Sequence, residues 1–177
     1  MNTFDFQDGL GPVAAHQHSN GGGWVADTAH VADTAYVGVN ARVFGTAVVS
    51  GDARICDDAR VTGDAVVCDD AVVRDDAVVG GNAQIRGYAQ IFGMAVVSGD
   101  ARVCDDARVT GDALVSGSAV VGGNARITGK AQIGGNARVI DNAPSPGTTS
   151  LSLDAVIAAA KCLSENDRKA LMLSLIS

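Results

Sequence analysis

Aliphatic residues recur at a strict interval of six along most of this 177-residue chain. Every sixth residue from Val25 to Val139 is Val or Ile, and every sixth residue from Ala29 to Ala143 is Ala. An α-helix turns once in about 3.6 residues and would scatter these positions around its axis, so it cannot produce this period. The pattern predicts a solenoid, in which each short segment repeats the same place on a coil.

The spacing within each six-residue unit predicts which side chains face inward. An Ala and the Val or Ile that follows it, such as Ala65 and Val67, lie two residues apart. On an extended segment such residues point to the same side, so we expect both columns to form the interior. The residue between them then points outward. The Gly-Asp and Asp-Asp pairs supply the corners, because Gly tolerates positive φ and Asp bonds its own backbone in turns.

A second period sets the number of units in a coil. Glycine recurs every eighteen residues in one corner column, which consists of Gly45, Gly63, Gly81, Gly99, Gly117 and Gly135. Three six-residue units therefore form one triangular coil. The twenty units predict six to seven coils, a stack of about 30 Å at roughly 4.8 Å per coil.

The repeat resembles that of the hexapeptide-repeat superfamily, whose fold is a left-handed parallel β-helix. The resemblance covers residues 25–143 and rests on the aliphatic column and the small residue at the fifth place of each unit. It implies the left-handed sense, which the period alone does not supply. The segment from His16 to Gly38 and the GDARV and GNARI units also resemble uncharacterised hexapeptide-repeat proteins of bacteriophages.

A long segment of the repeat region is duplicated. Residues 48–67 recur almost unchanged as residues 96–115, displaced by 48 positions. Because 48 is not a multiple of eighteen, we expect the two copies to lie on different faces of the triangle. The duplication lengthens the rod without copying a site that lies on a single face.

The two ends of the chain depart from the repeat. Residues 1–24 are predicted to form an N-terminal cap, with Trp24 as its largest buried side chain. Two prolines and a glycine in residues 144–150 indicate a linker. Apolar residues at helical spacing in residues 151–177 predict two short helices, which either cap the last coil or join subunits.

Composition and charge exclude several classes of function. A formal net charge of −7 argues against binding to nucleic acid, which needs a basic surface. No run of about eighteen apolar residues occurs, so we expect neither a membrane span nor export, and predict a cytoplasmic protein. The four cysteines lack CxxC spacing and are predicted to be free thiols.

Many members of the superfamily are acyltransferases that use acetyl-CoA, and this resemblance implies a catalytic histidine beside a loop extruded from the coils. The unbroken register leaves no such loop, and the only histidine within the repeats is His30. His30 is thus the candidate base if the chain is an acyltransferase, and our prediction is that it is not an enzyme. His16 and His18 are expected to be structural, and we predict neither a metal nor a cofactor.

The residues at the outward positions of the strands indicate a contact surface. One outward column carries three consecutive apolar residues, Val78, Val96 and Leu114, and such a strip usually marks an interface. The resemblance implies a parallel trimer. We therefore expect a non-catalytic, homo-oligomeric structural or binding protein, derived from a phage. The alternative is a phage antagonist of host defence that holds a host protein or a small nucleotide between subunits, with Arg108 and Arg126 as phosphate contacts.

Overall fold

The structure is a computed structural model that describes residues 2–141. Within that range the chain forms 22 strands and no helix. The predicted linker, residues 144–150, and the predicted helices of residues 151–177 lie outside the described residues. The strands are β1 Thr3–Phe4, β2 Val13–Gln17, β3 Trp24–Ala26, β4 His30–Val31, β5 Tyr36–Val37, β6 Arg42–Val43, β7 Val48–Val49, β8 Arg54–Ile55, β9 Arg60–Val61, β10 Val66–Val67, β11 Val72–Val73, β12 Val78–Val79, β13 Gln84–Ile85, β14 Gln90–Ile91, β15 Val96–Val97, β16 Arg102–Val103, β17 Arg108–Val109, β18 Leu114–Val115, β19 Val120–Gly123, β20 Arg126–Ile127, β21 Gln132–Ile133 and β22 Arg138–Asp141.

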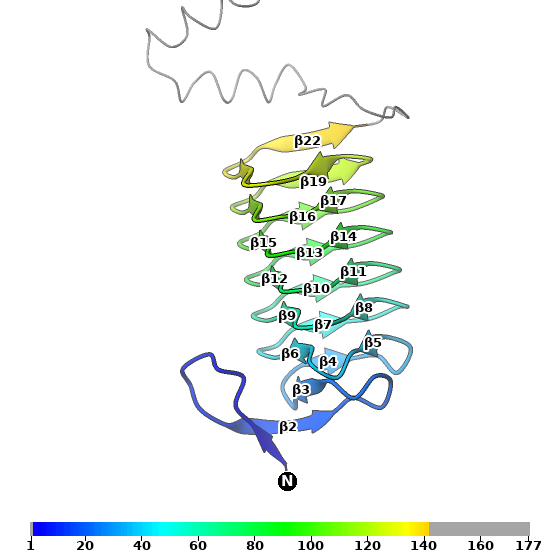
Figure 1. The fold of residues 1–177 in the computed structure, drawn as a ribbon, viewed down its shortest axis with the longest axis vertical. Helices are drawn as coiled ribbons and strands as arrows, with labels where there is room; N and C mark the ends of the chain where they lie inside the picture. The colour runs from blue at the N-terminus through cyan, green and yellow to red at the C-terminus, as the bar shows by residue number, and fades with distance from the viewer. Residues whose placement is uncertain (1, 142–177) are drawn as a thin grey trace, which may run out of the picture.

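From β3 onward the strands build a parallel solenoid with three sheets (Figure 1). Each strand pairs in parallel with the strand three places further along the chain, and the paired residues are eighteen apart, as in Val78 with Val96. The nine-stranded sheet contains β12, β15 and β18, the seven-stranded sheet contains β10, β13 and β16, and the six-stranded sheet contains β11, β14 and β17. The predicted parallel β-helix of six to seven triangular coils is confirmed. Its left-handed sense stays a prediction.

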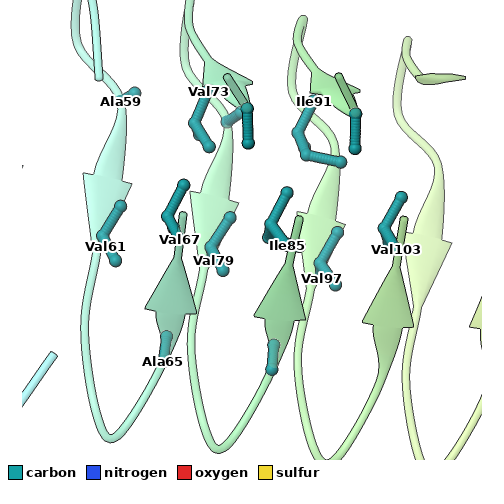
Figure 2. Packing of buried hydrophobic residues seen from close by; sticks show 14 of the residues in the cluster. Ala59, Val61, Ala65, Val67, Val73, Val79, Ile85, Ile91, Val97 and Val103 are labelled. Atoms are coloured by element: carbon teal, nitrogen blue, oxygen red, sulfur yellow. The ribbon is translucent and has the colours of Figure 1, made fainter. Parts of the chain in front are cut away.

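The interior consists of the two periodic columns, as the spacing predicts. The Ala, Val and Ile residues of these columns are fully buried in the middle coils, whereas the residues between them are half-buried or exposed. Figure 2 shows Val61, Val79 and Val97 in line on successive coils, with Val67, Ile85 and Val103 in a second line. β-branched side chains suit such short strands because branching at Cβ favours extended backbone. The core is therefore thin, and its cross-section is the same in every middle coil.

The corners differ from the expectation in one respect. Every sixth residue from Gly45 to Gly135 has positive φ, and each of these residues is Gly or Asp. The prediction that corner aspartates bond their own backbone is wrong for this column, because the carboxylates reach the next coil. The Asp69 carboxylate accepts a hydrogen bond from the Gly87 N–H at 2.9 Å, and the Asp105 carboxylate accepts one from the Gly123 N–H at 2.9 Å. These aspartates tie adjacent coils together.

An antiparallel hairpin precedes the first coil. Strand β2 pairs with β1 on one side and with β3 on the other, so the hairpin extends the nine-stranded sheet beyond the solenoid. Phe6 is the largest fully buried side chain of the structure, and it packs between the Phe4 and Phe44 rings. Trp24 is only half-buried and stacks on Phe4, so the prediction that it is the largest buried side chain is wrong. Trp24 starts a sheet strand and points outward, where the hairpin covers it in part.

The C-terminal end of the solenoid is more open than the N-terminal end. In the last described coil the inward residues Ala131, Ile133 and Val139 are only partly buried, whereas Val25 in the first coil is fully buried. Among residues 2–141 there is no helix long and apolar enough to cross a membrane.

Candidate functional site

An uncharged strip occupies the outward face of the nine-stranded sheet. Val78 on β12, Val96 on β15 and Leu114 on β18 are paired in register on three adjacent coils. Each is half-buried, because its neighbours on the coils below and above cover part of it. We call these three residues the apolar strip. The structure brings them together as the sequence predicts.

Small side chains lie beside the apolar strip. The second outward residue of each coil on this face is Gly80, Ser98 or Ser116. Gly80 is buried, because the Thr62 side chain of the preceding coil lies against it, whereas Ser98 and Ser116 are half-buried. The equivalent column on the six-stranded sheet contains the bulkier Arg74 and Phe92. The face therefore has small side chains beside the apolar strip, and it carries no charge between Arg60 and Gln132 on its outward positions.

Arginines interrupt the other two faces. On the six-stranded sheet Arg108 and Arg126 are adjacent in register on β17 and β20, and both side chains are exposed. Two neighbouring guanidinium groups supply forked donors of the kind that phosphate accepts. On the same side of the solenoid, closer to its N-terminal end, the Arg74 guanidinium lies 4.4 Å from the centre of the Phe92 ring.

His30 lies at the N-terminal end of the solenoid, exposed on β4. It lines a shallow depression together with His16, Val48 and Ser50. The His16 Nδ1–H donates a hydrogen bond to the Asp27 carboxylate at 2.8 Å, which orients the ring of His16. The sequence did not indicate this pair, because His16 lies on β2 and Asp27 directly follows β3, eleven residues later, and the antiparallel pairing of these strands brings the two together.

The remaining N-terminal histidine is structural. His18 is buried, and its Nε2–H donates a hydrogen bond to the Ala35 carbonyl oxygen at 3.0 Å. His16 and His18 therefore point in different directions. Within residues 2–141 no group of three or more His, Cys, Asp or Glu side chains is arranged to hold a metal ion.

Three of the four cysteines lie within the described residues, and none of the three forms a disulfide, as predicted. Burial raises the pKa of the Cys56, Cys68 and Cys104 thiols above the ordinary value. Asp69 raises the pKa of Cys68 further and Asp105 that of Cys104, because a negative charge disfavours the thiolate. The thiols are consequently weak nucleophiles at neutral pH.

Two exposed apolar residues of the middle coil stand out only in the structure. Tyr88 and Met94 each expose 62% of their surface and project from two different corners of the same coil. The pattern of the strand positions does not indicate these two residues. The signal that could have found them is the corner position itself, which is polar in the other regular coils.

Comparison with known protein families supports the repeat. The YdcK β-solenoid repeat family matches residues 53–69, 101–117, 107–123 and 131–143. These segments all lie within the solenoid and cover less than half of the chain. Among curated proteins, none matches the chain.

Proposed function

We propose that this chain is a non-catalytic, homo-oligomeric β-helical protein that serves a structural or binding role and assembles as a parallel trimer. The observation that carries the proposal is the apolar strip, three aliphatic side chains in register on an uncharged face. A contiguous apolar strip on the surface of a soluble protein usually marks a contact. We also propose that the chain derives from a phage, because the segment from His16 to Gly38 and the GDARV and GNARI units resemble hexapeptide-repeat proteins of bacteriophages.

The assembly is tested by native mass spectrometry of the full chain. Three chains of 17.8 kDa should give one species of about 53 kDa. The spectrum also separates the proposal from its main alternative, a small nucleotide or host protein held between subunits at Arg108 and Arg126. A retained ligand that disappears when both arginines are replaced by Gln would favour the alternative. A species of single-chain mass would contradict the trimer.

The non-catalytic part of the proposal rests on the regular register of the coils. From β3 to β22 each strand follows the last without an extruded loop, so among residues 2–141 no loop encloses a substrate beside His30. We expect incubation with acetyl-CoA and a panel of amine and hydroxyl acceptors to release coenzyme A only at the background rate. Turnover that is lost in His30→Ala would contradict this expectation and establish an acyltransferase. His16→Ala is the matched variant, because His16 lines the same depression.

A further inference from the structure

Met94 is an anomaly among the corner residues of the solenoid. The residue that follows each positive-φ corner is polar in fourteen of the sixteen units from residue 46 to residue 136, and the exceptions are Tyr88 and Met94. Both are 62% exposed. Tyr88 retains a hydroxyl group that water can solvate, whereas the Met94 side chain offers only a weakly accepting sulfur. Within residues 46–136, Met94 is thus the one strongly apolar residue at these corner positions.

The position of Met94 connects it to the apolar strip. It lies on the corner between the six-stranded and the nine-stranded sheets, since β14 precedes it and β15 follows it. Phe92, Met94 and Val96 alternate with inward or corner residues, so all three point outward along one coil. The apolar surface therefore continues from the strip around this corner. Tyr88 lies on the opposite corner, between β13 and β14, away from the nine-stranded sheet.

The geometry of a closed trimer limits which surface of one copy can contact the apolar strip of the next copy. A cyclic trimer uses two different patches on each chain, and because neighbours are turned by about 120°, the two contact directions on one chain lie about 60° apart. The three faces of a triangular coil point in directions about 120° apart, so two faces cannot close a ring of three. A face and an adjoining corner are about 60° apart. The patch that partners the nine-stranded face must therefore be one of its two corners.

Only one of those corners is apolar at the height of the strip. The corner shared with the seven-stranded sheet carries Asp64, Asn82 and Asp100. The corner shared with the six-stranded sheet carries Met94 at the height of Val96, with Asp76 one coil below and Asp112 one coil above. Met94 and Val96 belong to the same coil, so a contact between them does not shift one copy along the solenoid axis relative to the next. The ring closes instead of growing into a fibre.

We propose that Met94 of one copy docks on the apolar strip of its neighbour, beside Val96, with its thioether next to the small side chain of Ser98. This inference rests on the proposed trimer and names the second half of its interface. Methionine suits the role, because its unbranched and flexible side chain fills irregular gaps. Asp76 and Asp112 then lie at the rim of the contact, where water reaches their carboxylates.

The first test compares two substitutions of equally exposed residues in the same coil. Met94→Asp should convert the trimer to single chains by sedimentation velocity at micromolar concentration, with the β-type circular dichroism unchanged. Tyr88→Asp should sediment like the parent chain. A Met94→Asp protein that keeps the parent mass, in a protein whose parent is a trimer, overturns this inference alone. A parent that is itself a single chain overturns the proposed function together with it.

Mixing distinguishes two different patches from a contact between identical patches. Val96→Asp and Met94→Asp should each be monomeric, but an equimolar mixture retains one intact interface, formed by Met94 of the first protein and the strip of the second. We expect a one-to-one species of about 36 kDa, twice the 17.8 kDa chain. Each protein alone at the same total concentration is the control.

Cross-linking provides a readout for the case in which a single interface is too weak to survive separation. In a Cys162→Ser background, the double variant Met94→Cys with Ser98→Cys should give covalent dimers and trimers under mild oxidation. The two new thiols of one chain are about 13 Å apart along the strand and cannot bridge each other. The double variant Tyr88→Cys with Ser98→Cys should stay single. Equal cross-linking of the two double variants would overturn the docking of Met94. So would the absence of the cross-link together with the absence of the one-to-one species in the mixing experiment.

Discussion

Replacing Ala83 by leucine should destabilise the solenoid by about 1 to 3 kcal/mol or more, because it inserts three carbon atoms into a core that has no free space. Ala83 is fully buried in a middle coil, immediately before β13. The coils above and below prevent the backbone from moving aside, since each strand is paired on both edges. The measurement is the free energy of unfolding from urea denaturation.

Gln84 supplies the control for this prediction. It is the next residue, begins β13 and points outward, where it is half-buried. Gln84→Leu should therefore change the free energy of unfolding by less than about 0.5 kcal/mol. Equal losses for Ala83→Leu and Gln84→Leu would mean that the inward and outward assignments are wrong.

Val96→Asp should dissociate the oligomer and leave the coil folded. Val96 is the middle residue of the apolar strip, with Val78 and Leu114 in register on either side. Burying a fully exposed side chain of this size stabilises by roughly 1.5 to 3 kcal/mol, and because these three are already half-buried, we expect them together to contribute on the order of 2 to 4 kcal/mol to assembly. An aspartate at the centre would bury an unpaired charge instead. Sedimentation velocity should show a smaller species with unchanged β-type circular dichroism.

Val66 is a matched control for this substitution. It is an outward, half-buried valine on β10, next to Val48, but it belongs to the seven-stranded sheet. Val66→Asp should leave the oligomer intact. If Val96→Asp also sediments like the parent, the strip is not the subunit contact. Deletion of residues 151–177 would then show whether that segment covers the strip.

The sequence determined the architecture because the fold is periodic. The six-residue spacing of residues such as Ala65 and Val67 places every inward side chain, and the eighteen-residue spacing of glycines sets three units to a coil. The duplicated segments also lie on different faces, as expected, since β7 is in the seven-stranded sheet and β15 in the nine-stranded sheet. In a solenoid each unit contacts its neighbours at a constant separation, so a local pattern is sufficient to predict long-range pairing.

Only the tertiary structure decided how side chains act between coils and at the ends. The Asp69 carboxylate bonds the backbone of the next coil at Gly87, and no pattern within one unit shows whether it reaches that far. Residues 1–24 have no period, so the burial of Phe6, the partial burial of Trp24 and the pairing of His16 with Asp27 depend on how the hairpin folds back on the first coil. The six-residue period assigns each side chain a direction, but distances between side chains from separate coils follow from the stacked backbone, and the sequence alone does not contain them.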